Sequence, residues 1–173
     1  MNAGKLHPGY FKILFRGETD DSSVAAVHQC ASELVRNRCI EFEPFTDSWR
    51  QAQELMWRAD LLLIFSGSPL EVPAKFYDYL KTGKPIFAIA EPGALTELLD
   101  STSSGIWADP ADPAGIAAGL LRALELPSVT PEEAERRWSS QFHFRSLTAQ
   151  LAGWIRRLAV QHSTGAGSAG TEV

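Results

Sequence analysis

Apolar runs that alternate with amphipathic segments predict an α/β fold. The runs at 61–65 and 85–90 are apolar without alternation, as expected of strands covered on both faces. The segment between them reads as a loop and then a helix, which begins near Pro73 and ends at Gly83. Proline suits the first turn of a helix, and glycine suits its left-handed C-terminus. This order of elements predicts a βαβ unit with two adjacent, central parallel strands.

The rest of the chain continues this alternation. Further strands are predicted at 11–16, 39–45 and 105–108. Helices are predicted where apolar residues recur at helical spacing, at 24–36, 49–58, 94–99, 114–124, 132–139 and 144–160. The pattern indicates a Rossmann-like open parallel sheet with helices on both faces. We expect one domain over residues 10–161 and a disordered tail over 162–173, which has little to bury.

Composition narrows the class of protein. The chain has 173 residues, of which 45% are hydrophobic and 21% are charged, as in an ordinary globular protein. Its net charge is −5, so we expect no basic surface that binds nucleic acid. Its apolar runs are too short to span a bilayer, and the first residues lack the apolar core of a secretory signal. Cys30 and Cys39 fit a reducing compartment, with a disulfide between them as the alternative. We expect a cytoplasmic location, either free or peripheral at the inner membrane face.

Residues that bind metals or act as nucleophiles form no recognisable cluster. None of the four histidines has ligand spacing to cysteines or acids: His7, His28, His143 and His162. Ser66 and Ser68 lack the Gly-x-Ser-x-Gly surroundings of a serine nucleophile. We therefore predict no metal site and assign no catalytic residue.

The helix that follows the 61–65 strand is the first candidate for ligand binding. Backbone N–H groups and the helix dipole at such an N-terminus favour an anion, most often phosphate. Lys75 and Asp78 are three residues apart and share a helix face. A nucleotide would fit this pair, with Lys75 on phosphate and Asp78 on the ribose hydroxyls. A solvated helix face with a weak ion pair would show the same spacing, so spacing alone leaves both readings open.

Four segments, in order, resemble the C-terminal half of family 4 (group 1) glycosyltransferases. VPAKFYDYLKTGKPIFAI, at 72–89, resembles the motif P-x-K-x-x-[ED]-Y-L-x-x-G-[KR]-P of that half, the nucleotide-sugar-binding domain of a GT-B fold. The other three segments are MWRADLLLIFS, GALTELLDSTSSGIWADPADPAGIAAGLLRAL and FHFRSLTAQLAGWIRRL. The resemblance covers about residues 11–160.

This resemblance implies a donor site and a reaction. The loop at 66–72 and the next helix start would hold the donor phosphates, Asp78 the ribose, and the loop after the 39–45 strand the base. The donor-binding residues it implies are Ser66, Gly67, Glu71, Val72, Lys75, Asp78, Phe45 and Thr46. The implied reaction transfers a sugar, with retention, from a nucleotide-sugar donor to a glycan or lipid-linked acceptor. No cofactor beyond the donor substrate is implied, and the sequence offers no Asp-x-Asp cluster for a metal.

The chain also departs from the family pattern. The first of two acids common in the central segment falls at Leu70, with Glu71 beside it. The opening strand and helix of that half, with their diphosphate-binding arginine and lysine, have no counterpart, and neither has the acceptor-binding domain. We therefore expect a donor-binding domain that is inactive without an N-terminal half. The alternative is a non-catalytic Rossmann-like module that binds a nucleotide or a partner chain.

The predicted last helix carries more apolar residues than one small sheet needs. They are Phe142, Phe144, Leu147, Leu151, Trp154 and Ile155. Apolar patches of this size usually find a partner. We expect self-association, or a separate chain that supplies the other half. The alternative is a monomer whose last helix packs fully on its own sheet.

Overall fold

The computed structural model describes residues 10–45 and 48–165. They divide into two compact units, one ending at Ala59 and the other beginning at Asp60. The strands are parallel but pair in two separate groups, one in each unit. The α/β class with open parallel sheets is therefore confirmed, and the strands form two sheets where the sequence suggested one.

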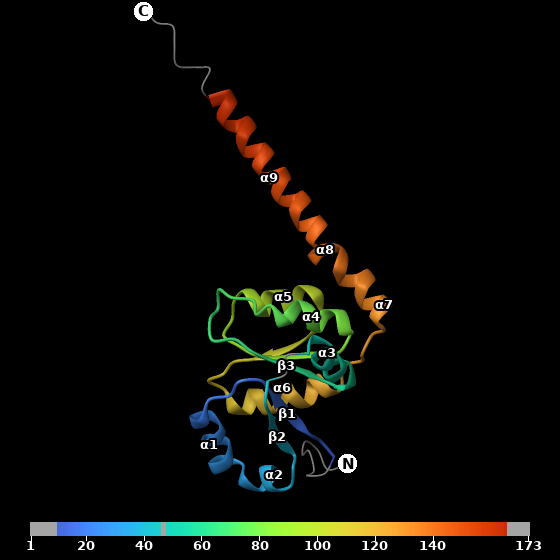
Figure 1. Ribbon diagram of the computed structural model, residues 1–173. Helices are drawn as coiled ribbons and strands as arrows, with labels where there is room; N and C mark the ends of the chain where they lie inside the picture. The colour runs from blue at the N-terminus through green and yellow to red at the C-terminus, as the bar shows by residue number, and fades with distance from the viewer. Residues whose placement is uncertain (1–9, 46–47, 166–173) are drawn as a thin grey trace, which may run out of the picture. The chain divides into compact units, whose positions relative to one another are not determined.

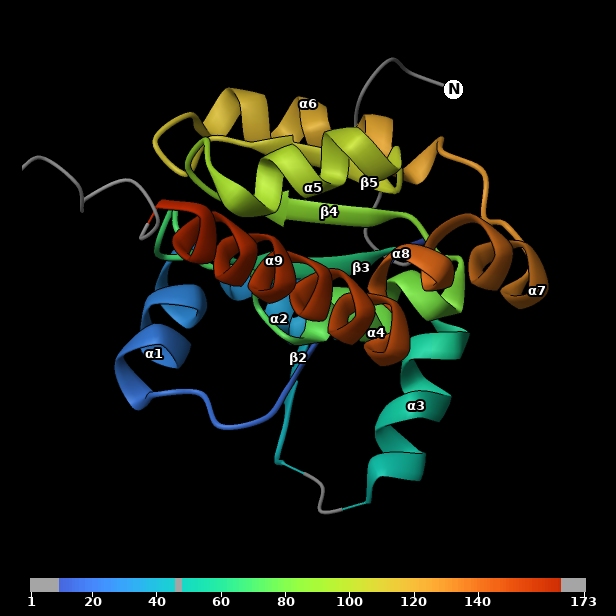
Figure 2. The same ribbon diagram turned by 90° about the horizontal axis from the view of Figure 1, so that it is seen from above.

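The second unit contains a three-stranded parallel sheet. Its strands are β3 (Leu62–Phe65), β4 (Ile86–Ile89) and β5 (Gly105–Ala108), with β4 between the other two (Figure 2). Ile64 pairs with Ala88, and Ile86 pairs with Gly105. The prediction that β3 and β4 are adjacent is confirmed. Only β4 is central, because β3 is an edge strand of this sheet.

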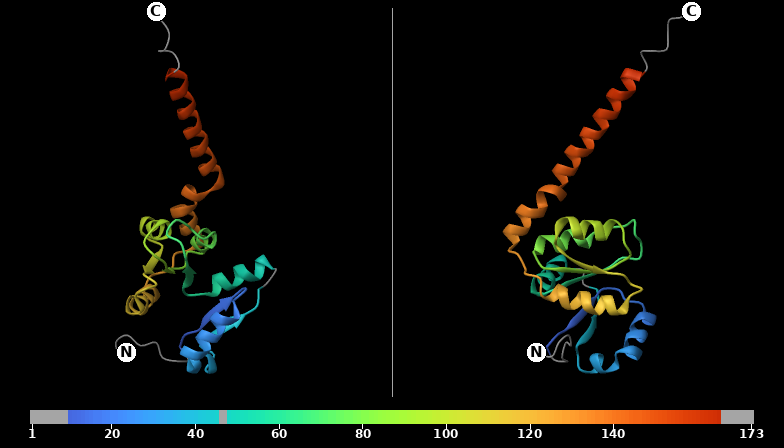
Figure 3. Two further views of the ribbon diagram at one scale, coloured as in Figure 1. Left: turned by 90° about the vertical axis from the view of Figure 1, so that its left-hand side faces the viewer. Right: turned by 180° about the vertical axis from the view of Figure 1, so that it is seen from behind.

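Helices cover both faces of this sheet, as the apolar runs predict. Helices α4 (Lys75–Thr82) and α5 (Ala94–Thr102) lie on one side of the strands, and α6 (Pro113–Leu124) lies on the other (Figures 1 and 3). Ile64 and Ile86 pack with Phe76 and Leu99 under α4 and α5. Phe87 points to the opposite face, where a second core cluster includes Ala108 and Ala123. Consecutive strand residues thus face different helix layers, which explains the absence of alternation.

The end of α4 has the predicted form. Gly83 is in the left-handed region, with φ = 70°, and its N–H donates to the Leu80 carbonyl. Its own carbonyl accepts from Val129 N (2.8 Å), which ties the chain after α6 to this corner. A residue with a Cβ would be strained at this φ and would approach the Val129 carbonyl.

A series of short helical segments follows α6. These are α7 (Pro131–Ala134), the π-helical segment η1 (Glu135–Ser139) and α8 (Ser140–Phe142). Trp138 is buried and donates from Nε1 to the Thr102 carbonyl (3.1 Å), so it fixes the segment to the end of α5. Phe142 is half-buried against the same core, with its ring 5.3 Å from that of Tyr77. The sequence groups Phe142 with the exposed apolar residues of the last helix, but in the structure it is a packing residue.

The last helix, α9 (Phe144–Gly165), exposes its other predicted apolar residues. Phe144, Leu147, Leu151, Trp154 and Ile155 are all exposed, so the alternative of a fully packed last helix is wrong. The helix continues through Gly165, past the predicted boundary at 161. Residues 166–173 of the predicted tail lie outside the described residues. Within the part that the structure describes, no helix is both long and apolar enough to span a bilayer.

The first unit has a two-stranded parallel sheet. Its elements are β1 (Ile13–Arg16), α1 (Asp21–Cys30), α2 (Ser32–Arg36), β2 (Ile40–Glu43) and α3 (Trp49–Arg58). The predicted 24–36 helix is two helices, separated at Ala31. It begins early because Asp20 accepts a hydrogen bond from Ser23 N (2.9 Å) as an N-cap. Both cysteines are free thiols, so the disulfide alternative is wrong.

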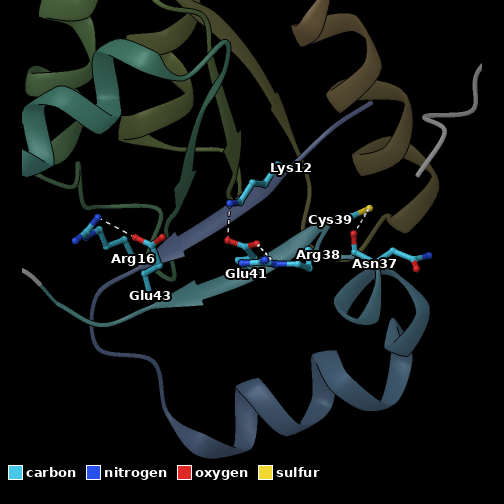
Figure 4. A network of polar contacts seen from close by, with 7 residues as sticks. All are labelled: Lys12, Arg16, Asn37, Arg38, Cys39, Glu41 and Glu43. Atoms are coloured by element: carbon cyan, nitrogen blue, oxygen red, sulfur yellow. Dashed lines mark hydrogen bonds and ion pairs between the residues drawn. The ribbon is translucent and has the colours of Figure 1, made fainter. Parts of the chain in front are cut away.

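Charged pairs connect the two strands of this sheet (Figure 4). Arg16 donates to Glu43, its partner in register, at 2.8 Å. Glu41 accepts from Lys12 and from Arg38, the latter at 3.0 Å. The hydrogen bond from Lys12 is the main cause of a lowered pKa for the Glu41 carboxyl. The ionised form of Glu41 therefore stabilises the folded state.

We expect the stabilisation by Glu41 to depend on pH in a defined direction. Its contribution is complete above the ordinary pKa of 4.5 and is lost as the pH falls through the lowered folded value. Glu41→Gln should therefore speed amide exchange of β1 and β2 at neutral pH, with a difference from the wild type that shrinks in acid. Glu18→Gln is the control, because Glu18 makes no ion pair within residues 10–45. A Glu41→Gln effect that grows in acid would contradict this assignment.

Candidate functional site

The candidate site lies at the carboxyl edge of the second unit's sheet. Ligands of parallel α/β sheets bind beyond this edge, in the loops that follow the strands. β3 ends at Phe65, and the Ser66 amide continues the strand pairing by donating to the Ile89 carbonyl (3.2 Å). Two loops therefore begin side by side at this edge, 66–74 after β3 and 90–93 after β4.

Hydrogen bonds within the first loop determine its shape. The Ser66 hydroxyl donates to the Ser68 carbonyl (3.0 Å), and Leu70 N donates to the Ser68 hydroxyl (3.3 Å). Both serine hydroxyls thus already take part in the loop's own structure. Ser66 is half-buried and Gly67 is exposed. A phosphate at this loop would bind mainly to backbone amides, as in other anion-binding turns.

The start of α5 holds this loop in place. Ala94 N donates to the Pro69 carbonyl (2.8 Å), across 25 positions of sequence. Gly93 allows this approach, because a Cβ at that position would lie 2.1 Å from the Pro69 oxygen. The Thr96 hydroxyl accepts from Gly93 N (2.9 Å) and fixes the same turn. The sequence around Pro92 and Gly93 predicts a break in the chain and carries no signal for this contact.

The start of α4 offers fewer free amides than the sequence suggests. Phe76 N and Tyr77 N donate to the carbonyls of Pro73 (2.9 Å) and Ala74 (3.2 Å). The amides just before them, at Ala74 and Lys75, are the ones that an anion could use. The Lys75 side chain is exposed and has no ion pair among the residues that the structure describes. Lys75 is therefore the cation available at this helix start.

Asp78 lies in the first turn of α4 and pairs with a different lysine from the one expected. Its carboxylate is 3.1 Å from Lys81 Nζ, one turn towards the C-terminus, whereas Lys75 lies one turn before it. The Asp78 side chain is 30% exposed, so solvent and a ligand can still reach it. Burial is the main cause of a raised pKa for the Tyr79 hydroxyl, and the negative charge of Asp78 raises this pKa further. Lys81 thus competes with a ribose for the Asp78 carboxylate, and the role of Asp78 as a ribose acceptor stays a prediction.

The remaining predicted residues differ in their surroundings. Val72 is half-buried against the core, so only its backbone is available to a ligand. Glu71 is exposed beside Leu70, which is 87% exposed and occupies the position of the missing acid. Phe45 belongs to the first unit, where it is exposed. Thr46 lies outside the described residues. The proposed base contact of Phe45 and Thr46 therefore stays a prediction.

Away from the candidate site, the described residues form a further hollow whose lining serves packing. A hollow at the opposite, amino edge of the sheet is lined by residues that include Pro85, Ser104, Arg137 and Trp138. Trp138 and Ser104 are buried there and serve packing. Within residues 10–45 and 48–165, no three histidine, cysteine or acidic side chains come together as metal ligands.

Comparison with solved structures identifies proteins of similar fold. Anabaena Alr3699/HepE, crystallised in complex with UDP, matches 87% of this chain with 20% identity and a TM-score of 0.64. WaaG, a glycosyltransferase involved in lipopolysaccharide biosynthesis, matches 78% with 17% identity and a TM-score of 0.56. The α,α-trehalose 6-phosphate synthase of Burkholderia multivorans matches 96% with 13% identity and a TM-score of 0.53. No family model and no curated protein sequence matches the chain.

The chain corresponds to less than half of each of these proteins. It covers 42% of HepE, 35% of WaaG and 39% of the trehalose 6-phosphate synthase. At such low identities the likeness establishes the fold: a Rossmann-like α/β arrangement shared with part of each protein. The fold that the sequence motif implied is thereby confirmed.

Proposed function

We propose that the chain binds a nucleotide sugar at the carboxyl edge of the β3–β4–β5 sheet, as the donor-binding part of a glycosyltransferase. The main support is the contact of Pro69 with Ala94, which holds the 66–72 loop at the edge where α4 begins. Further support comes from the resemblance of the 72–89 segment, and from a fold shared with a protein crystallised with UDP.

In this proposal, each group at the edge has a chemical role. The amides of Gly67, Ser68 and Val72 in the loop, with those of Ala74 and Lys75, hold the diphosphate, and the Lys75 ammonium offsets its charge. Asp78 accepts hydrogen bonds from the ribose hydroxyls after its pair with Lys81 loosens. As the sugar–phosphate bond breaks, negative charge grows on the leaving diphosphate. Amides and a lysine already in place would stabilise that charge.

Transfer itself is proposed to need a second domain. The similar solved proteins are more than twice as long as the part that this chain matches. We therefore assign acceptor binding, for a glycan or a lipid-linked acceptor, to a partner domain or a separate chain, and expect no turnover by this chain alone. A cytoplasmic location at the inner membrane face fits a lipid-linked acceptor.

Asp78→Ala tests the ribose contact. We expect the variant to bind UDP or GDP more weakly by about 1–3 kcal/mol, because a charged hydrogen-bond acceptor is lost. Isothermal titration with the nucleoside diphosphate that binds the wild type measures the difference. Lys81→Ala is the matched control: it breaks the same ion pair but keeps the carboxylate, so its affinity should equal or exceed that of the wild type. If both substitutions weaken nucleotide binding equally, the Asp78 carboxylate does not contact the ribose.

A second candidate is a module that binds a nucleotide or a partner chain without catalysis. Leu70 at the position of the missing acid favours it, because that acid would contact the donor sugar. Competition experiments separate the two functions. A donor-binding domain should prefer one nucleotide sugar to its free diphosphate or to other sugars, whereas a simple nucleotide module should not distinguish the sugars.

A further inference from the structure

The first unit contains a polar hollow beside its small sheet. The hollow has a volume of about 280 Å³ and is lined by Arg16, Gln51, Glu54, Leu55 and Arg58. Arg16 is the last residue of β1, and the other four residues belong to α3. The hollow therefore reaches the carboxyl edge of this sheet, which is the edge where parallel α/β sheets bind their ligands.

The face of α3 that lines this hollow is mostly polar. Gln51, Glu54, Leu55 and Arg58 recur at intervals of three, one and three. At 100° per residue they fall within an arc of about 100°. A helix that packs on a sheet normally directs an apolar stripe toward it. Because only Leu55 is apolar on this face, the space beside β1 suits a polar ligand better than it suits a packed core.

The charges around the hollow favour an anion. Arg16 Nη1 donates to Glu43 (2.8 Å), and Glu54 is paired with Arg50 on the same helix (3.3 Å). Arg58 makes no ion pair within residues 10–45 and 48–165, so no carboxylate offsets its charge. The hollow and its ion-pair partners thus contain three guanidinium groups and two carboxylates. This excess of positive charge attracts an anionic ligand.

We propose that this hollow binds a small phosphorylated polyol. Arg16 and Arg58 hold the phosphate, because guanidinium groups match phosphate oxygens with two parallel N–H groups. Gln51 and Glu54 exchange hydrogen bonds with the hydroxyl groups. Inorganic phosphate alone would fill only part of the space, since 280 Å³ corresponds to about nine water molecules at about 30 Å³ each. A ligand of about ten non-hydrogen atoms, such as glycerol 3-phosphate, fits this volume.

Arg16 is held in position before a ligand arrives. Its side chain is 28% exposed, and Glu43, its register partner on β2, fixes the guanidinium group (Figure 4). A guanidinium group that is already oriented loses little freedom on binding. The bond to Glu43 leaves other N–H groups of Arg16 for the phosphate. This inference rests on the first unit alone and does not depend on nucleotide binding by the second.

Amide resonances of the isotope-labelled full chain, titrated with glycerol 3-phosphate, test the proposal. We expect saturable shifts at residues 16–18 and 51–58. Inorganic phosphate and glycerol should each bind at least about tenfold more weakly, because each offers only part of the contacts. The absence of saturable shifts in these segments would overturn the proposal. Equal affinity for inorganic phosphate or for glycerol would also contradict it, since the ligand would then not be recognised as a phosphorylated polyol.

Substitution of Arg58 tests the phosphate contact. Arg58→Gln should weaken glycerol 3-phosphate binding about tenfold or more, because a charged hydrogen-bond donor is lost. Arg58→Lys keeps the charge without the planar fork, so its affinity should lie between those of Arg58→Gln and the wild type. Arg36→Gln is the matched control, since Arg36 is also exposed in the last turn of a helix of this unit but lies outside the hollow. Equal weakening by Arg58→Gln and Arg36→Gln would show that the overall charge attracts the ligand, and the proposal would be wrong.

Titrations of both ligands on both variants keep this site apart from the proposed donor site. Arg58→Gln should leave the affinity for UDP or GDP unchanged, and Asp78→Ala should leave the affinity for glycerol 3-phosphate unchanged. If Arg58→Gln weakens both ligands, one site serves both and the inference of a separate site is wrong. A chain that binds glycerol 3-phosphate but neither nucleoside diphosphate would refute only the proposed donor site.

Discussion

Replacing Phe76 by alanine is expected to lower the free energy of unfolding of the second unit by about 3–5 kcal/mol. Phe76 is fully buried and packs with Ile64, Ile86 and Leu99 between α4 and the sheet. Alanine would leave a cavity that a close-packed core fills only in part. Because Phe76 directly follows Lys75 in α4, a loosened helix would also displace the candidate phosphate site.

Urea denaturation followed by far-UV circular dichroism measures this change. Phe144→Ala is the matched control, because the same substitution at a 79% exposed position should change stability by less than about 0.5 kcal/mol. If both variants unfold at the same urea concentration as the wild type, α4 does not pack on the sheet as described.

Gly93→Ala is expected to destabilise the second unit by about 2–4 kcal/mol, as the sum of overpacking and a lost hydrogen bond. The new Cβ would lie 2.1 Å from the Pro69 oxygen, a backbone atom that no side-chain rotation can move away. The loop must therefore shift, and the hydrogen bond from Ala94 N to Pro69 would lengthen or break. We expect nucleotide affinity to fall by about tenfold or more, because the displaced amides no longer converge on the phosphates.

Thermal melting and nucleotide titration of Gly93→Ala test the contact between the two loops, in which Ala94 N donates to the Pro69 carbonyl. Gly153→Ala is the control, since a Cβ there meets only the end of the Arg157 side chain, at 3.6 Å. That substitution should be neutral or slightly stabilising within a helix. A Gly93→Ala protein that melts and binds like the wild type would show that the loop does not depend on Pro69.

Local patterns in the sequence predict most elements of this fold. The apolar runs at β3 and β4 and the glycine at position 83 place strands and a helix end within one or two residues. Strand pairing is different, because partners are chosen by contacts between distant segments. The separation into two sheets therefore left no local signal. The break at Ala31 is hidden for a local reason, because the apolar spacing continues through it.

The site shows the same division between local and distant information. Lys75 and Lys81 are each three residues from Asp78, and apolar periodicity does not distinguish them. An acid that precedes a base is the favoured order on a helix, so this preference was the available signal for Lys81. The contact of Pro69 with Ala94 joins two separate loops and could not be predicted from either one. Phe142 is grouped with the apolar residues of α9 because it directly precedes them in the sequence, although it packs against Tyr77.

Calorimetric titration of the full chain with UDP and with GDP, each followed by its nucleotide sugars, tests the central claim most directly. We expect one of the two diphosphates to bind at a single site, to compete with its own nucleotide sugar, and to leave that sugar unhydrolysed. The absence of binding by both diphosphates and their sugars, in a chain shown to be folded, would contradict the account.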